Sequence, residues 1–86
     1  MFKVELSHEA QRFYDRADKS TAKKLARCFV ALEADPRAGN NVKPLRGTLA
    51  GSYRYRIGDL RVVYIIHDRS VTVFVITIAK RSDVYE

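Results

Sequence analysis

Basic and aromatic side chains gather in the segment from Lys43 to Tyr64, and these residue types make it the segment best suited to chemistry. It holds five Lys and Arg residues, whereas Asp59 is the only acidic residue between Lys43 and His67. A guanidinium binds a phosphate through two parallel hydrogen bonds and stays protonated at neutral pH. The segment therefore predicts an anion site that stabilises negative charge but is poor in proton acceptors.

The arginines of this segment lie in a predicted β-hairpin. Two runs of β-forming residues flank Gly58-Asp59, a strong signal for a two-residue turn. Side chains alternate between strand faces, so Arg54 and Arg56 share one face. Pairing across the turn brings Arg56 near Arg61, and adjacent like charges are costly unless an anion lies between them. An anion-binding face is favoured over the alternative, surface ion pairs with Asp and Glu. The opposite, apolar face of the first strand holds Tyr53, Tyr55 and Ile57.

Further candidates flank this face. Lys43 and Arg46 lie in the preceding loop, while Lys80 and Arg81 leave the last predicted strand and are expected to close the same concavity. Tyr85 suits either the edge of the core or stacking on a nucleobase, and its spacing favours neither. RNA carries its own nucleophile, the 2′-hydroxyl, so the arginines could stabilise the charge that develops during cleavage. A self-sufficient nuclease would still need a base.

Metal and cofactor chemistry is not indicated. His8 and His67 are far apart, and Cys28 is the only cysteine, so no Cys/His cluster has metal-ligand spacing and no internal disulfide can form. There is no glycine-rich phosphate loop and no Gly-x-Ser-x-Gly motif. No stretch reaches transmembrane length and the N-terminus has no apolar signal region, so we expect no cofactor, no membrane association and a cytoplasmic location.

Length and composition predict one domain over residues 1–86. The formal net charge of +6 favours an anionic partner, either nucleic acid or an acidic protein. The order β-α-α-β-β-β predicts an α+β fold, in which a helical hairpin packs on one face of a small antiparallel sheet. The elements are a strand over about 2–6, a helix from His8 capped by Ser7, a helix capped by Ser20 and ended by Pro36, a loop over 36–51, and strands over about 52–57, 60–67 and 71–79.

Taken together, the segments PLRGTLAGSYRYRIGDLRVVYIIHD and VFVITIAKRSDVY resemble the RelE family of bacterial and archaeal toxins, the toxin halves of type II toxin–antitoxin pairs. The resemblance covers nearly the whole chain. It implies an mRNA endonuclease that acts on translating ribosomes and cuts codons in the A site.

The resemblance also implies residue roles. Arg54 and Arg56 would hold or activate the scissile phosphate, and Arg61 would stabilise the transition state. Arg81 would stabilise the phosphate and protonate the leaving group, and Tyr85 would stack on or orient the nucleotide. The flanking residues expected to contact RNA or the ribosome are Lys43, Arg46 and Lys80.

One departure leaves the general base open. The best-known member has lysines where this chain has Arg54 and Arg56, and an arginine hardly gives up its proton. Tyr85 or solvent then becomes a candidate base.

Three other functions stay open: a ParE-like inhibitor of DNA gyrase, a non-catalytic RNA- or ribosome-binding module, and a relic toxin without activity. The tail Lys80-Arg81…Tyr85 favours the ribonuclease branch over the first.

An acidic, RelB-like antitoxin is the partner that the resemblance implies, in a hetero-oligomeric complex. We expect a segment of it to fold as a helix or strand over the basic concavity and the helical hairpin. The other implied partners are mRNA in the A site and the ribosome with its rRNA.

Overall fold

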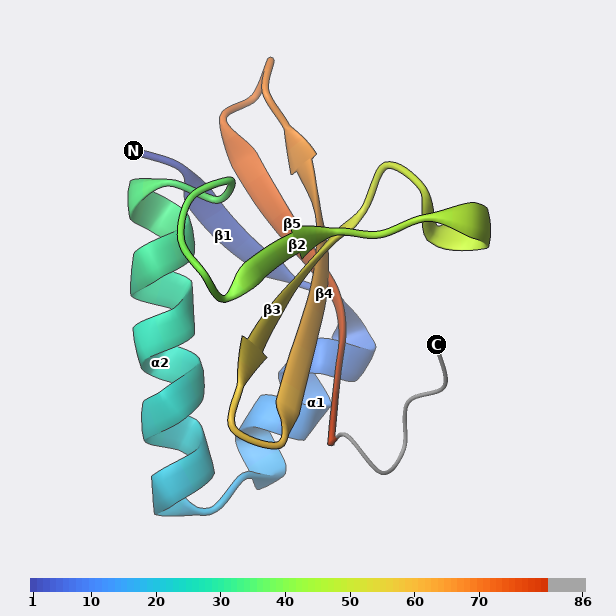
Figure 1. The fold of residues 1–86 in the computed structure, drawn as a ribbon. Coiled ribbons are helices and arrows are strands. Elements are labelled where there is room, and N and C mark those ends of the chain that lie inside the picture. Colours follow the sequence, from blue (N-terminus) through green and yellow to red (C-terminus); the bar gives the residue numbers. More distant parts are fainter. Residues whose placement is uncertain (81–86) are drawn as a thin grey trace.

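The computed structural model describes residues 1–80, so the predictions made for Arg81 and Tyr85 lie outside the described residues. Two helices pack on a five-stranded sheet (Figure 1). In chain order the elements are β1 (Lys3–Leu6), α1 (His8–Arg16), α2 (Lys19–Ala34), β2 (Val42–Pro44), the 3-10 turn η1 (Gly47–Leu49), β3 (Tyr53–Ile57), β4 (Leu60–His67) and β5 (Thr72–Lys80).

The strand order is β1-β5-β4-β3-β2, which confirms the predicted α+β class. Two details of the prediction are wrong. The sheet is mixed, because β1 runs parallel to β5 while the other pairs are antiparallel. A further strand, β2, lies within the segment predicted as loop. Its three residues include an exposed lysine and a proline, so they lack the apolar alternation that marks a strand.

The helix starts follow from side-chain caps. The Ser7 hydroxyl accepts a hydrogen bond from the Ala10 N–H at 3.0 Å, as predicted for α1. Helix α2 begins earlier than predicted, because the Asp18 carboxylate accepts from the Thr21 N–H at 2.8 Å and Ser20 lies inside the helix. The hydrogen bonds from Thr21 and the nearby lysines hold the pKa of Asp18 below its usual value. Neither helix is long and apolar enough to cross a bilayer.

The core lies between the helices and one face of the sheet. It is formed by Ala10 of α1, by Leu25, Cys28 and Leu32 of α2, and by Leu60, Val62, Tyr64, Val73, Val75 and Ile78 of the two long strands. Every second residue of β3 packs against this cluster, namely Tyr53, Tyr55 and Ile57. The predicted alternation of β3 is therefore confirmed, and Arg54 and Arg56 lie on the face that points away from the core.

The loop after α2 is fastened to β3 and β4. The buried Tyr64 hydroxyl donates to the Pro36 carbonyl at 2.6 Å, and the Tyr53 and Tyr64 rings stack with centroids 5.9 Å apart. The Arg37 guanidinium forms two hydrogen bonds to the Asp68 carboxylate, at 2.9 and 2.8 Å, and lies 5.9 Å from the Tyr53 ring centroid. The strands that carry the arginines are thus braced from the core side.

Candidate functional site

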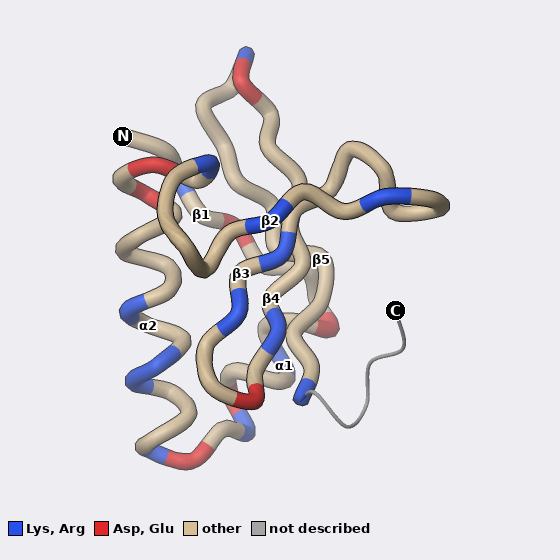
Figure 2. Tube along the Cα trace, in the orientation of Figure 1, with Lys and Arg blue, Asp and Glu red and all other residues tan. Residues whose placement is uncertain are grey.

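Like charges face each other across two neighbouring strand pairs. Arg56 is directly opposite Arg61 on β4, as predicted from the turn, and Lys43 of β2 is opposite Arg54. Directly opposite residues on one face have Cβ atoms only about 5 Å apart, and like charges there destabilise a sheet by a few tenths of a kcal/mol or more. Figure 2 shows basic segments on β2, β3 and β4, with an acidic segment at the β3–β4 turn. Such an arrangement favours an anion bound between the strands.

These side chains line a hollow of about 780 Å³, which we call the arginine cavity. Its lining residues are Lys43, Pro44, Leu45, Arg46, Thr48, Leu49, Arg54, Arg56 and Arg61. None of these described residues is acidic. The structure therefore brings together five of the basic residues singled out from the sequence, from β2, β3, β4 and the β2–β3 loop.

The cations of the arginine cavity differ in burial. Arg61 is only 6% exposed, Arg54 and Arg56 are half-buried, and Lys43 and Arg46 are exposed. A charge in a poorly solvated position interacts with an anion more strongly than one in water. Arg61 is thus best placed to stabilise charge that develops in the cavity, and Lys43 and Arg46 suit a looser contact with a longer anionic chain.

Asn41 holds the β3 arginines in position, and sequence reasoning missed it. Its backbone carbonyl accepts from the Arg54 guanidinium at 2.9 Å and from the Arg56 N–H at 3.0 Å. Its side-chain amide donates to the Arg56 carbonyl at 2.7 Å. Asparagine is favoured in turns because its side chain bonds nearby backbone groups, and that preference was the available signal.

Lys80 does not line the arginine cavity, so the expectation that it closes the same concavity is wrong. A β-bulge puts one extra residue, Ile76, between the register pairs Val63↔Thr77 and Tyr64↔Val75. A one-residue shift reverses which face each later side chain occupies. Lys80 is therefore opposite the core residue Leu60, on the helix side of the sheet.

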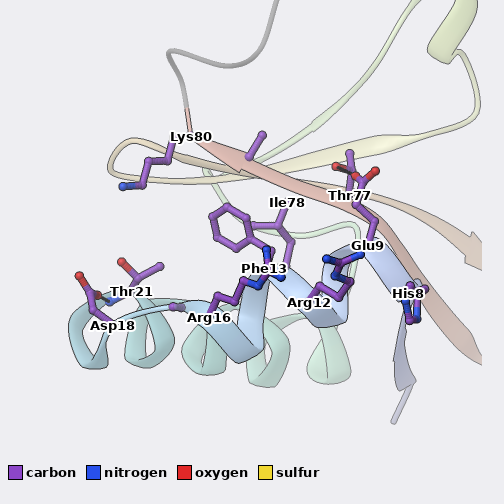
Figure 3. A pocket seen from close by; sticks show the side chains of 12 residues that line it. His8, Glu9, Arg12, Phe13, Arg16, Asp18, Thr21, Thr77, Ile78 and Lys80 are labelled. Carbon is purple, nitrogen blue, oxygen red and sulfur yellow. Dashed lines mark hydrogen bonds between the residues drawn. The ribbon is translucent and has the colours of Figure 1, made fainter.

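On that side Lys80 lines a second hollow of about 970 Å³, between α1, the start of α2 and β5, which we call the helix-side cavity (Figure 3). Its acidic residues have structural contacts. Glu9 accepts a hydrogen bond from the Thr77 hydroxyl, and Asp18 caps α2. Cations and carboxylates are mixed here, unlike in the arginine cavity.

The described residues offer few proton acceptors to the arginine cavity. Burial raises the pKa of Tyr55 and of Tyr64, so neither phenol ionises at neutral pH. Burial also raises the pKa of Cys28 to about 12, which keeps this thiol protonated and inert. Residues 1–80 contain no group of three or more His, Cys, Asp or Glu side chains that could hold a metal ion. The described side chains thus supply this cavity mainly with positive charge.

Known proteins share this chain's sequence pattern and fold. The sequence model described as the ParE toxin of the type II toxin–antitoxin system parDE matches residues 4–85. Toxin RelG of Mycobacterium tuberculosis is 42% identical over 43 residues, which are 50% of this chain and 49% of RelG. The match thus spans about half the length of that curated relative.

Solved structures extend the likeness to nearly the whole chain. The RelBE2 toxin–antitoxin complex of M. tuberculosis gives a TM-score of 0.80 at 26% identity, covering 93% of this chain and 98% of that one. The archaeal RelE–RelB complex of Pyrococcus horikoshii gives 0.80 at 22% identity, with 96% and 98% covered, and supports the fold alone.

Proposed function

Because the chain belongs to the ParE toxin family, within the RelE/ParE superfamily of type II toxin–antitoxin toxins, we propose that it is a ribosome-dependent endoribonuclease. In this proposal the toxin cuts mRNA codons in the ribosomal A site and so inhibits translation. The observation that supports it most is the arginine cavity, in which a buried arginine and four other cations meet and none of the lining residues among 1–80 is acidic.

The proposed reaction is attack by the RNA 2′-hydroxyl on the adjacent phosphorus. The 2′-oxygen–phosphorus bond forms, the bond to the 5′-oxygen of the next nucleotide breaks, and the products are a 2′,3′-cyclic phosphate and a 5′-hydroxyl. Arg54 and Arg56 hold the scissile phosphate, and Arg61 stabilises the extra negative charge of the pentacoordinate transition state. Arg81 protonates the leaving 5′-oxygen and regains its proton from solvent, and Tyr85 orients the nucleotide, as the family resemblance implies.

The proton of the 2′-hydroxyl needs an acceptor that the described lining of the arginine cavity lacks. A protonated guanidinium has no lone pair to accept a proton, and Tyr55 and Tyr64 pack on the core side of the sheet with raised pKa values. We assign this role to Tyr85 or to water held in the translation complex. Positioning of the substrate by the ribosome then supplies much of the rate, because correct alignment of reacting groups lowers the barrier by several kcal/mol.

An acidic, RelB-like antitoxin is the proposed protein partner, in a cytoplasmic hetero-oligomer. The related RelBE2 and archaeal RelE–RelB structures are toxin–antitoxin complexes. An acidic segment over the arginine cavity would neutralise the charges that the reaction needs. Purification of the toxin from its native operon should yield a stable complex, and recovery of only free toxin would contradict this partnership.

Inhibition of DNA gyrase is the second candidate, because the matching family model carries the ParE description. Two assays on one preparation separate the candidates: primer extension on translation complexes of known A-site codon, and supercoiling by purified gyrase. The proposed function predicts new mRNA ends within the A-site codon and unchanged supercoiling. Intact mRNA with blocked supercoiling would replace the ribonuclease by the gyrase inhibitor.

A further inference from the structure

We propose that the β2–β3 loop is the base-recognition wall of the arginine cavity, with Leu49 packing on the face of a nucleobase and Thr48 hydrogen bonding to its edge. This role rests on the proposed function, since it presupposes a single-stranded RNA substrate. It adds a specificity-determining element to a site whose other lining groups are mostly cations.

Leu49 is an exposed apolar side chain that lines the arginine cavity. It is 46% exposed, and the other exposed large apolar residues among residues 1–80 are Met1, Val30, Val71 and Ile76. A single exposed leucine is ordinary on a protein surface. Leu49, however, lines the same cavity as the arginines, and Pro44 and Leu45 extend this apolar lining. None of the other four lines it.

The loop is built to keep its shape. The Leu45 N–H donates to the Ser52 carbonyl at 2.9 Å, and the Ser52 N–H donates to the Leu49 carbonyl at 3.0 Å, which closes the base of the loop. Gly47 and Gly51 have φ values of +69° and +93°, in the left-handed region that glycine enters without steric cost. In Figure 1 this segment projects well beyond β2 and β3. A loop closed by its own hydrogen bonds presents Thr48 and Leu49 as a defined surface.

The two walls of the cavity fit the two parts of a nucleotide. Contacts between cations and phosphates position a strand but do not distinguish its bases. A base has an apolar face and a polar edge, and RNA-binding proteins recognise unpaired bases through both. Here Arg54, Arg56 and Arg61 supply the phosphate wall, whereas Leu49 and Thr48 offer an apolar contact and a hydroxyl that both donates and accepts. The occupant of the apolar wall is therefore a nucleobase of the strand whose phosphate lies on the arginines.

The test measures binding, separately from cleavage. Short 2′-O-methyl RNAs, which cannot be cut, are made with each of the four bases at one position and titrated against the toxin. Leu49→Ala should weaken binding of every oligonucleotide about tenfold, on the scale of lost base stacking. Thr48→Val should change the ratio between the best- and worst-bound base by about 2- to 10-fold, on the scale of one hydrogen bond.

Two controls make the result specific. Thr48→Ser keeps the hydroxyl and should keep the base ratio, and Val30→Ala removes an exposed apolar side chain on α2 and should leave all affinities unchanged. All positions are exposed, so folding should be unaffected, and circular dichroism verifies it. If Leu49→Ala fails to fold, the base ratios of Thr48→Val and Thr48→Ser alone test the recognition wall.

The outcomes separate this inference from the proposed function. If the wild-type toxin cuts A-site mRNA and the variants keep wild-type affinities and base ratios, the recognition wall is overturned and the proposed function stands. If binding depends on the base and the variants alter it, but the toxin cuts no mRNA, the proposed ribonuclease activity is overturned and the recognition wall is retained. Wild-type toxin that binds every oligonucleotide equally, or binds none, also overturns the wall. If Leu49→Ala weakens binding of an acidic antitoxin peptide and leaves RNA binding unchanged, the surface belongs to the antitoxin and the recognition wall is overturned.

Discussion

The two faces of the sheet use charge in different ways. On the helix side, the cavity between α1 and β5 mixes cations with carboxylates, and the carboxylates of Glu9 and Asp18 have structural hydrogen bonds. On the opposite face, five cations share a cavity whose described lining contains no acid. The first pattern stabilises helices and strand ends, whereas the second sets like charges opposite each other across the strands. A cluster of like charges that lines a cavity thus points to a function, whereas mixed charges with structural hydrogen bonds point to a role in the fold.

Arg56→Gln gives the largest contrast between function and stability. It removes a charge from the arginine cavity, so cleavage should fall by about 100-fold or more, as for other donors that stabilise a transition state. It also relieves the like-charge pair with Arg61, so the free energy of unfolding should change by no more than about 1 kcal/mol. Single-turnover cleavage and urea unfolding measure the two effects. A loss of unfolding free energy as large as the loss of transition-state stabilisation would contradict the distinction between the two faces.

Asn41→Ala tests positioning within the arginine face. It removes the amide that donates to the Arg56 carbonyl, so β3 should shift slightly relative to the phosphate. Cleavage should fall by about tenfold, because small misplacements of catalytic groups are costly. Substrate affinity, measured with an uncleavable mRNA, should change less than the rate. A proportionate loss of affinity would mean that Asn41 contacts RNA itself.

Ser7→Ala addresses the helix side. The Ser7 hydroxyl accepts from the Ala10 N–H and donates to the Ile76 carbonyl at 2.6 Å, which joins the start of α1 to the bulge in β5. Its loss should lower the free energy of unfolding by about 1–2 kcal/mol. At a temperature where the variant is fully folded, its cleavage rate should match the wild type within about twofold, a margin far below the loss of a transition-state contact. A large drop in that rate would show that the two faces are coupled.

The smallest effect concerns the exposed Arg37–Asp68 pair. Hydrogen bonds from Arg37 lower the pKa of Asp68 in the folded protein. This carboxylate therefore adds stability above its unfolded pKa, near 3.8, and that stability disappears as the pH falls through the lower folded value. Asp68→Asn should melt slightly below the wild type at pH 7, and the two should converge in acid. A difference that grows in acid would contradict the assignment.

Sequence reasoning succeeded where local signals decide the structure. The Gly58-Asp59 turn fixes the register of β3 and β4, so the pairing of Arg56 with Arg61 followed directly. Alternation along β3 likewise separated its arginines from Tyr53 and the core. Five basic residues of the arginine cavity were found in this way because short-range rules hold over one hairpin and its flanking loop.

It failed where the structure depends on distant contacts. The parallel pairing of β1 with β5 joins the two ends of the chain, and no local pattern encodes its direction. The bulge at Ile76 reverses the faces of β5, so Lys80 lies on the helix side against expectation. The Asn41 backbone carbonyl also holds Arg54, and residue type does not reveal where a carbonyl points.

In the proposed function the arginine face carries the chemistry, and two variants on opposite faces of the sheet test this assignment. Single-turnover cleavage of an A-site codon is measured in purified translation complexes at saturating toxin, with Arg61→Ala and the helix-side control Arg12→Ala. Arg61→Lys, which keeps a charge but loses the planar fork, guards against misfolding of the buried site. We expect a loss of about 100-fold or more for Arg61→Ala, a smaller loss for Arg61→Lys, and a rate within about twofold of wild type for Arg12→Ala. Equal losses at both faces, or cleavage that survives in folded Arg61→Ala, would contradict the claim.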